Sequence, residues 1–455
     1  MKTYDIAVIG GGPAGYLAAE RAAEAGKKVI LAEKNAVGGV CLNEGCIPTK
    51  TLLHAAKIFE YGQYKGKEFG VSCENPRLHH PRAIARKQDV VKTLVGGVSS
   101  ALARKGIDII QTEAGLRKED NDFVLTCGNE TIRTSKALIA TGSEPVIPNI
   151  PGVAGGLADG SVLTSREILE MREIPEQLVV VGAGVIGLEM AAYFSIAGSR
   201  VTVVEMTGHI GGPIDMELSQ TLQRNLENMG IHFVLGSRIF DVSGSTACVK
   251  TPSGTQEFPY DKLLMCVGRK PSLNIPGLSG MNLYMEHGAP VVDKHCETNI
   301  PGLYAAGDVN GKYMLAHVAY REAEVAVNHM MGKADEMNYT AIPGVIYTQP
   351  EAAFCGLTEQ QATEKGIQTV VKKASINLNG RHIAENGLSG GFCKLVLDGK
   401  GQTILGASLL CSYASEIIYP LTLMIQNKIP LEGIKRTIFP HPTVCEIIRE
   451  TIFTE

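Results

Sequence analysis

Hydrophobic and polar positions follow the same pattern twice along this chain. Residues 6–33 read IAVIGGGPAGYLAAERAAEAGKKVILAE, and residues 178–205 read LVVVGAGVIGLEMAAYFSIAGSRVTVVE, so the two segments align without a gap. Each begins with an apolar run of strand length, passes through a glycine-rich turn into a stretch with helical spacing, and ends in a second apolar run. This order predicts a strand–helix–strand unit at both places, and hence an α/β fold.

A G-x-G-x-x-G motif joins the first strand to the helix in each unit. The glycines are Gly10, Gly12 and Gly15 in the first unit and Gly182, Gly184 and Gly187 in the second. The first glycine makes the tight turn, the second lets the backbone approach a pyrophosphate, and the third lets the helix pack on the strand. Free N–H groups and the positive dipole at the helix N-terminus favour phosphates. We therefore expect one dinucleotide per unit, rather than two glycine-rich turns in an ordinary α/β sheet.

A glutamate closes each unit and indicates which nucleotide is bound. Glu33 and Glu205 end the second apolar runs, where an acid accepts hydrogen bonds from ribose hydroxyls. A 2′-phosphate would require an arginine nearby, but Glu205 is followed by MTGHIGG, in which His209 is only a weak substitute. The second unit is therefore expected to prefer NAD over NADP.

The remaining apolar segments divide the chain further. Three of these segments are predicted to be strands that end at or near a glycine: residues 134–145, 260–271 and 300–309. From Pro343 onward, short strand-like stretches such as residues 392–398 precede a helical segment near residues 415–426. Residues 341–455 are thus predicted to form a separate α+β domain. The expected domains are 1–145, 146–268, 269–340 and 341–455.

Composition and charge exclude several classes of protein. The chain has 455 residues, of which 44% are hydrophobic and 20% charged, as is ordinary for a globular enzyme. A net charge of −4 without a long basic run argues against nucleic acid or an anionic membrane as a partner. The most apolar stretch, residues 177–194, contains Glu189 and several glycines, and Asp5 interrupts the N-terminal apolar run. Neither is typical of a membrane span or a signal peptide, so we expect a cytoplasmic protein.

Only two of the cysteines, Cys41 and Cys46, form a close pair. Eight others are expected to be small buried hydrophobes: Cys73, Cys127, Cys248, Cys266, Cys296, Cys355, Cys393 and Cys411. Zinc would need about four ligands, and no second Cys/His cluster lies nearby in the sequence, so no metal site is predicted. A structural disulfide closing so short a loop would remove little entropy from the unfolded chain. A redox-active pair explains the spacing better.

The residues after the pair predict a helix that begins near the second cysteine. Pro48 suits the first turn of a helix, and apolar helical spacing continues beyond it. Cys46 is therefore expected at or just before a helix N-terminus, where the dipole lowers the pKa of a thiol. Residues five apart in a regular helix are too distant for a disulfide, whose Cα atoms must lie within about 7 Å. Cys41 is accordingly expected in an irregular loop that the neighbouring glycines permit.

Several motifs together resemble the flavin-dependent pyridine nucleotide–disulfide oxidoreductases. They are GGVCLNEGCIPTK (38–50), the two glycine motifs, ATGS (140–143), AAGDV (305–309) and HPTVCE (441–446). The resemblance covers nearly the whole chain. It implies two Rossmann-like domains, one for FAD and one for NAD, and a C-terminal α+β dimerisation domain that makes the protein a homodimer.

Details within the motifs favour one branch of the family. IPTK after Cys46, MLAH at 314–317 and Glu205 resemble the branch that reoxidises protein-bound dihydrolipoamide more than the NADPH-linked glutathione reductase branch. This resemblance implies a lipoyl domain or lipoyl carrier protein of a 2-oxoacid dehydrogenase or glycine-cleavage system as the partner.

The resemblance also assigns roles to individual residues. Contacts to FAD are implied for Gly10, Gly12, Gly15, Glu33, Gly39, Lys50, Ala114, Thr141, Gly142, Ser143, Asp308, Met314, Leu315, Ala316 and His317. Contacts to NAD are implied for Gly182, Gly184, Val185, Ile186, Gly187, Glu189, Glu205 and Gly268. Cys46 would be the thiolate nearest the flavin, and Cys41 the outer thiol that exchanges with substrate. Lys50 would pair with Glu189, which explains a charge in an otherwise apolar helix.

A histidine near the C-terminus has two interpretations. By itself, His441 followed by Glu446 reads as a surface His-Pro turn and an acid at the start of a helix. The resemblance implies instead that His441 is the catalytic base and Glu446 the acid that orients its ring. The base would then come from the partner subunit, and the His441–Pro442 bond is a candidate cis peptide.

Overall fold

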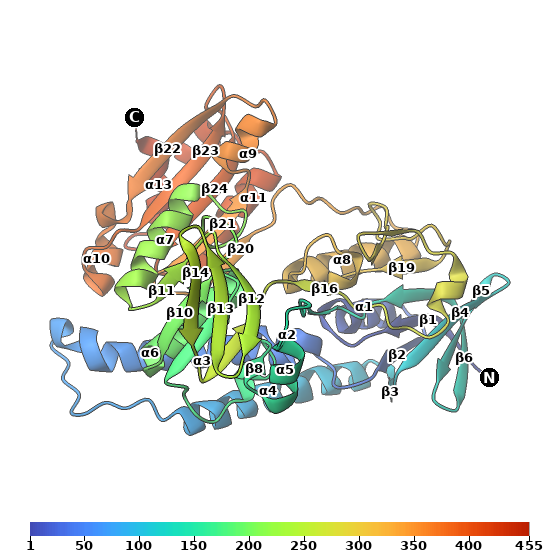
Figure 1. Cartoon of the computed structure of the whole chain (residues 1–455). Coiled ribbons are helices and arrows are strands. Elements are labelled where there is room, and N and C mark those ends of the chain that lie inside the picture. The colour runs from blue at the N-terminus through green and yellow to red at the C-terminus, as the bar shows by residue number, and fades with distance from the viewer. Residues whose placement is uncertain (455) are drawn as a thin grey trace.

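Three large sheets, accompanied by smaller ones, succeed one another across the computed structural model, which describes residues 1–454. Figure 1 shows the first sheet at the right with the N-terminus, the second in the middle, and the C-terminal sheet at the upper left. The predicted α/β class is confirmed, as is a C-terminal part in which helices pack on an antiparallel sheet.

The first sheet has seven strands, in the order β3-β2-β1-β6-β5-β4 with β19 beside β6. The strands are β1 (Lys2–Ile9), β2 (Val29–Glu33), β3 (Asp108–Gln111), β4 (Ala114–Glu119), β5 (Asp122–Cys127), β6 (Glu130–Ile139) and β19 (Leu303–Ala305). β1, β2, β3, β6 and β19 run parallel, whereas the pairs β4–β5 and β5–β6 are antiparallel. The glycine turn after β1, the segment after β6 and the segment after β19 therefore meet at one edge, where ligands bind in such sheets.

Helices cover the first sheet and extend beneath the second. They are α1 (Pro13–Glu24), α2 (Gly39–Glu44), α3 (Cys46–Glu60), α4 (His80–Arg104) and α8 (Ala316–Met330). Alanine occupies most buried positions of α1, so α8 packs closely against it. α3 packs on α4 and on a helix of the second unit, and Figure 1 shows α3 and α4 running along the base of the molecule.

The second unit repeats the first in outline. Its parallel sheet, in the order β11-β10-β9-β15-β8, consists of β8 (Val162–Leu163), β9 (Gln177–Val181), β10 (Arg200–Val204), β11 (His232–Val234) and β15 (Lys262–Met265). Its helices are α5 (Val153–Asp159), α6 (Val185–Ala197) and α7 (Met216–Asn228). An antiparallel sheet of β12 (Arg238–Ser243), β13 (Thr246–Thr251) and β14 (Gly254–Pro259) shares a hydrophobic core with it.

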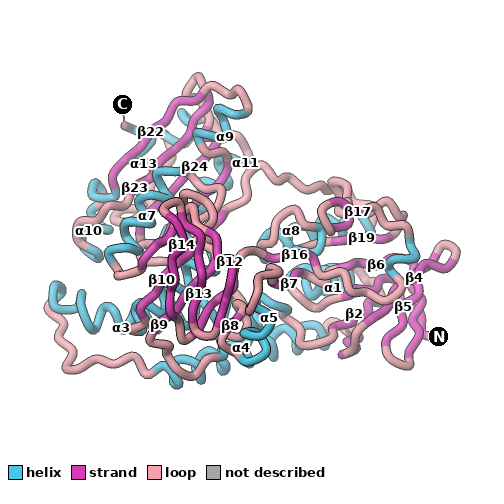
Figure 2. The backbone as a smooth tube through the Cα atoms, in the orientation of Figure 1, coloured by secondary structure: helices cyan, strands magenta, loops and turns pink. Residues whose placement is uncertain are grey.

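The C-terminal sheet is antiparallel, in the order β20-β21-β24-β23-β22. Its strands are β20 (Gly344–Ile346), β21 (Glu351–Gly356), β22 (Thr369–Ser375), β23 (Phe392–Asp398) and β24 (Ile404–Cys411), with helices α9 (Glu359–Glu364), α10 (Gly380–Asn386), α11 (Ala414–Gln426), α12 (Leu431–Lys435) and α13 (Glu446–Phe453). Figure 2 shows the long loop that leads from α8 to this part. One hydrophobic cluster joins α3, the second unit and this sheet.

Short elements complete the chain. Two-stranded ladders form between β7 (Ser143–Pro145) and β16 (Arg269–Pro271) and between β17 (Met285–Glu286) and β18 (Ala289–Pro290). Single helical turns occur at Tyr61–Lys65, Gly66–Phe69, Ile168–Glu170, Leu278–Met281, Asp308–Asn310 and Ile376–Leu378. Within residues 1–454, no helix has both the length and the apolar character needed to cross a membrane.

The prediction for the scattered cysteines is only partly right. Five of the eight are buried, whereas Cys248 and Cys266 are half-buried. Cys73 is exposed and lies in an irregular segment before α4.

Candidate active site

The cysteine pair lies where two helices meet. Cys41 is in α2 and Cys46 is the first residue of α3, with Gly45 between the helices at φ −147° and ψ −108°. A Cβ at Gly45 would lie 2.9 Å from the carbonyl oxygen of Val40, so glycine permits the sharp change of direction. The predicted place of Cys46 at a helix N-terminus is confirmed. The prediction of an irregular loop around Cys41 is wrong, because a break between two helices replaces the loop.

The two thiols differ in their electrostatic settings. The adjacent Cys46 thiol, together with burial, raises the pKa of Cys41 well above the ordinary thiol range. The adjacent Cys41 thiol and the positive charge of Lys50 lower the pKa of Cys46, although burial opposes them. The N-terminal end of α3 adds a further positive dipole at Cys46. Negative charge on the pair is therefore favoured at Cys46.

An ion pair next to the cysteines joins the first and second units. Lys50 Nζ, one turn after Cys46 in α3, lies 3.0 and 2.9 Å from the two carboxylate oxygens of Glu189 in α6. The Glu189 side chain is only 3% exposed. The backbone N–H of Tyr347, just after β20, donates to Glu189 at 3.1 Å, and the ammonium of Lys50 lies 4.3 Å from the Tyr347 ring centre. All three parts of the molecule thus meet at one buried carboxylate, which needs such partners.

A second polar cluster lies at the shared edge of the first sheet. Ser143 Oγ, after β6, donates to Asp308 Oδ2, after β19, at 2.5 Å. Arg269 donates from Nε to Ser143 Oγ and from Nη2 to the Ser143 carbonyl, both at 2.7 Å. Burial raises the pKa of Asp308, while Ser143 and the charge of Arg269 oppose the rise. Thr141 Oγ1 donates to the Ser272 carbonyl at 2.5 Å. Predicted FAD contacts from distant segments are therefore brought together here.

The other predicted FAD contacts lie on several separate segments of the first part of the molecule. Gly142 has φ 72°, with no atom within 4 Å of an added Cβ, and Ala114 is buried at the start of β4. The four residues before and at the start of α8 are Met314, Leu315, Ala316 and His317, of which the first three are half-buried and the last is exposed.

Glycine is required at the turns of both units. A Cβ at Gly10 or Gly15 would lie 2.3 or 1.8 Å from a backbone carbonyl oxygen, and one at Gly182 or Gly187 would lie 2.5 or 2.0 Å from one. Real Cβ atoms do not approach so closely, so only glycine fits the tight turn and the helix–strand contact. The predicted roles of the first and third glycines in forming the turn thus have a steric basis in this structure.

The middle glycines begin the helices and leave space. Gly12 and Gly184 are the N-cap residues of α1 and α6, both extended, and no other atom lies within 4 Å of a Cβ added at Gly184. Val185 and Ile186 form the first turn of α6, where N–H groups lack partners within the helix. Gly268, at φ 125°, likewise has open space. Open backbone at a helix N-terminus fits a pyrophosphate.

Glu33 and Glu205, the acids that close the two units, accept hydrogen bonds in the same way. Gly11 N–H donates to Glu33 at 2.6 Å, and Asn35 N–H donates to the other oxygen at 2.7 Å. Ala183 N–H donates to Glu205 at 2.7 Å, and Thr207 N–H donates to its other oxygen at 2.8 Å. Each carboxylate is thereby fixed beside its glycine turn, with lone pairs remaining for a ribose.

His441 and Glu446 form a separate pair in the C-terminal part. His441 Nδ1 lies 3.0 Å from Glu446 Oε1, and the Thr443 N–H donates to Oε2 at 2.9 Å. Although burial would raise the pKa of Glu446, these two partners lower it. The His441 side chain is 79% exposed, and the His441–Pro442 bond is cis. Glu446 is the first residue of α13, and Figure 1 shows α13 apart from α2, the helix of Cys41, within one chain.

Sequence reasoning missed several residues that support the site. Glu322 of α8, which is fully buried, accepts from Gly307 N–H at 2.7 Å, Asn310 Nδ2 at 2.8 Å and Tyr339 OH at 2.7 Å, and so holds the turn that carries Asp308. Burial raises the pKa of Glu322. An acid among the alanines and valines of α8 was a signal of the same kind as Glu189. No sequence pattern points to Arg269 or Tyr347.

Comparison with known proteins finds matches along the whole chain. The family model "Pyridine nucleotide-disulphide oxidoreductase" matches residues 4–323, and its dimerisation domain matches residues 342–452. The dihydrolipoyl dehydrogenase of Chlorobaculum tepidum is 36% identical over 460 residues, covering 99% of this chain and 96% of the relative. That of Chlamydia muridarum is 34% identical over 451 residues, with the same coverage. The structure of RclA from Escherichia coli, an HOCl-induced flavoprotein disulfide reductase, has a TM-score of 0.86 at 28% identity and 99% coverage of both chains.

Proposed function

The chain belongs to the pyridine nucleotide-disulphide oxidoreductase family, and from that premise we propose that it reoxidises protein-bound dihydrolipoamide with NAD⁺, as a dihydrolipoyl dehydrogenase. It is a flavoprotein oxidoreductase, and the cofactors of this family and of its dihydrolipoyl dehydrogenases are FAD and NAD. The observation that supports the proposal most is the arrangement of Cys41 and Cys46 at the start of α3, with Lys50 one turn away bound to Glu189 of the second unit.

The residues of the chain fit both cofactors. The first unit and residues 269–340 would hold FAD through the glycine turn, Glu33 and the Ser143–Asp308 pair, and residues 146–268 would hold NAD. When bound, FAD supplies a two-electron carrier between the thiol pair and NAD⁺. Glu205 brings negative charge to the ribose position, and no lysine or arginine lies in the seven residues after it, so a 2′-phosphate would be repelled.

The thiol chemistry is carried by the chain's own residues. In the oxidised enzyme Cys41 and Cys46 form a disulfide. A thiolate of the substrate attacks Cys41, which displaces Cys46 as a thiolate; the second substrate thiol then displaces Cys41 and closes the lipoyl disulfide. The substrate thus loses two electrons and two protons, the enzyme disulfide gains the electrons, and NAD⁺ finally takes up a hydride equivalent. Lys50 and the start of α3 favour the charge on Cys46.

The base for this exchange would come from a second copy of the chain. Within one chain α13, which begins at Glu446, lies apart from α2, and residues 342–452 match a dimerisation domain, which supports a homodimer. Glu446 accepts from Nδ1 and so directs Nε2 outward, where it would take the proton from the substrate thiol. His441→Gln is expected to lower turnover about 10²–10⁴-fold with the dimer intact, as for loss of a general base.

The deciding experiment is an assay of the purified holoprotein beside its absorption spectrum. We expect flavin bands and dihydrolipoamide-dependent reduction of NAD⁺, with NADP⁺ a poor substitute. The reduced lipoyl domain or lipoyl carrier protein of a 2-oxoacid dehydrogenase or glycine-cleavage system should then also serve as substrate, with a lower KM than free dihydrolipoamide. Flavin-loaded protein without dihydrolipoamide turnover would refute the assignment.

A second candidate is a reductase that runs in the opposite direction on another disulfide. The likeness to RclA, a flavoprotein disulfide reductase, favours it. This alternative predicts that NADH or NADPH reduces a substrate such as glutathione disulfide faster than lipoamide. Measuring both nucleotides against both disulfides separates the two functions.

A further inference from the structure

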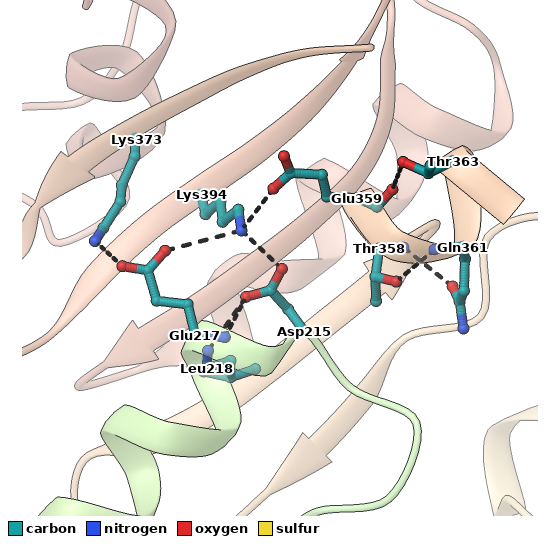
Figure 3. A network of polar contacts seen from close by, with 9 residues as sticks. All are labelled: Asp215, Glu217, Leu218, Thr358, Glu359, Gln361, Thr363, Lys373 and Lys394. Atoms are coloured by element: carbon teal, nitrogen blue, oxygen red, sulfur yellow. Dashed lines mark hydrogen bonds and ion pairs between the residues drawn. The ribbon is translucent and has the colours of Figure 1, made fainter. Parts of the chain in front are cut away.

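A buried lysine links the C-terminal sheet to the second unit. Lys394 lies on the interior strand β23 and is 7% exposed. Its Nζ lies 2.9 Å from Asp215 Oδ2, 3.2 Å from Glu359 Oε2 and 3.8 Å from Glu217 Oε2, and Figure 3 shows the three carboxylates converging on it. Burial alone would lower the pKa of Lys394, but Asp215 and Glu359 raise it. The ammonium is therefore charged, and its desolvation is offset only while these partners stay in place.

Asp215 uses its two oxygens for different tasks. Oδ1 accepts the backbone N–H groups of Glu217 at 3.0 Å and Leu218 at 3.2 Å, and so caps the start of α7. Oδ2 accepts from Lys394, as Figure 3 also shows. Asp215 itself is only 4% exposed. Asp215 thus caps α7 and at the same time binds the C-terminal sheet, to which Glu217 of α7 adds weaker contacts.

α7 in turn supports the glycine turn of the second unit. Ser219, in the first turns of α7, donates from Oγ to the Ile210 carbonyl at 2.8 Å and accepts the Ile210 N–H at 3.2 Å. The next residue, Gly211, donates its N–H to the carbonyl of Ala183 at 2.8 Å. Ala183 lies between the first two glycines of the motif. A path of hydrogen bonds and two short stretches of backbone, from the start of α7 to Ser219 and from Ile210 to Gly211, therefore runs from Lys394 to the turn that would face the nucleotide.

We propose that Lys394 is a positioning residue for the pyridine-nucleotide site. Lys394 binds Asp215 and thereby fixes the position of α7 and of residues 210–211, which contact the glycine turn. The affinity of the second unit for its nucleotide therefore depends on a contact with the C-terminal domain. The inference rests on the proposed function in one respect, that the second unit binds NAD. Lys373 provides a contrast, because it pairs with Glu217 from the surface, with a side chain that is 43% exposed.

The test compares matched variants of the holoenzyme. ADP-ribose, which lacks the nicotinamide and cannot react, is titrated by calorimetry into Lys394→Met, Lys394→Arg and the control Lys373→Met. We expect the dissociation constant to rise about tenfold in Lys394→Met, as for other couplings through packed networks. Lys394→Arg, which keeps the charge, should recover most of the affinity, and Lys373→Met should match the unaltered protein. The KM for NAD⁺ should rise with the dissociation constant for ADP-ribose, while kcat and the KM for dihydrolipoamide stay within about twofold.

The outcomes separate this inference from the proposed function. Unchanged ADP-ribose affinity in folded Lys394→Met would overturn it, and so would an equal loss in Lys373→Met. If Lys394→Met does not fold, Asp215→Asn decides, because asparagine still caps α7 but cannot pair with the ammonium; normal affinity there would also overturn it. Failure of dihydrolipoamide turnover in the unaltered enzyme would refute the function without touching the ADP-ribose comparison.

Discussion

The two dinucleotide units share a frame and differ in the segment that comes after it. In both, the N–H after the first glycine and an N–H two residues beyond the acid donate to the same carboxylate. After the acid, the first unit continues into α2 and α3 and presents two cysteines, whereas the second continues to Asp215 and α7 and attaches to the C-terminal sheet. The repeated strand–turn–helix–strand motif binds a nucleotide. The segment after it differs in function, because it carries the cysteines in the first unit and contacts the C-terminal sheet in the second.

The two turns also differ in how crowded they are. In the first unit Gly39, at φ 57°, lies so close that its Cβ would be 2.6 Å from the Cα of Gly12. In the second unit no atom lies within 4 Å of a Cβ at Gly184. The first turn is covered by the segment that carries the cysteines, while the second is open. This difference suits a cofactor that stays bound in the first unit and one that exchanges in the second.

The largest expected effect comes from removing a cysteine of the redox-active pair, which only the first unit carries. In Cys46→Ser we expect dihydrolipoamide turnover to fall by about 10⁴-fold or more, because without Cys46 no Cys41–Cys46 disulfide can form to accept the electrons. NADH should still reduce the bound flavin, as measured by absorbance under anaerobic conditions, because the second unit is untouched. Cys73, an exposed cysteine in the irregular segment before α4, provides the control: Cys73→Ser should turn over normally. Near-normal turnover in Cys46→Ser would remove that thiol from the mechanism.

Adding one methyl group should distinguish the crowded turn from the open one. Gly39→Ala combines a left-handed backbone with a close contact to Gly12, at a cost of about 1–3 kcal/mol for the strain alone. We expect most of its flavin to be lost on gel filtration. Gly184→Ala should keep its flavin and show instead a higher KM for NAD⁺. Equal flavin content in the two variants would mean that the crowding has no bearing on cofactor retention.

Exchanging the two acids for serine should give mirrored phenotypes of intermediate size. Glu205→Ser is expected to raise the KM for NAD⁺ about tenfold, the order of one charge-assisted hydrogen bond, with normal flavin content. Glu33→Ser should weaken flavin binding and leave the KM for NAD⁺ unchanged in the flavin-loaded fraction. Steady-state kinetics and flavin-to-protein absorbance ratios measure both. A single shared phenotype would indicate general loss of structure instead of two separate sites.

The smallest effect concerns the pH at which thiols react. In the reduced enzyme, iodoacetamide labelling of the Cys41–Cys46 pair should be appreciable at pH 7, because the pKa of Cys46 is lowered and thiolate is the reactive form. Cys266 of the second unit, whose pKa burial raises to about 12, should remain unlabelled. Lys50→Met should move labelling of the pair to higher pH, since it removes a charge that stabilises the thiolate. Peptide mass spectrometry checks this, and labelling of Cys266 first would contradict it.

Local sequence patterns were sufficient to predict the two strand–turn–helix–strand units but not the contacts between the parts of the molecule. The strands, the glycine turns and the helix that starts at Cys46 are predictable from short motifs. One charge in an apolar helix singled out Glu189, but its partner Lys50 came only from the resemblance to the family. Lys394 sits between apolar residues of β23 and gave the same kind of signal, yet its partner Asp215 lies 179 residues away and no periodicity connects them. The helix break at Gly45 was missed because spacing alone does not distinguish a loop from two helices that meet at an angle.

The carboxylate of Glu189 has a mechanical consequence. Lys50 of the flavin-binding part and the backbone N–H of Tyr347 in the C-terminal part both bind it. Moving either part away would leave a buried carboxylate without one of its partners, which is energetically costly. Hinge bending of the kind that opens and shuts many two-lobed enzymes is thereby penalised. The three parts are therefore expected to move together, so that a ligand reaches the thiols or the second glycine turn without a hinge opening between them.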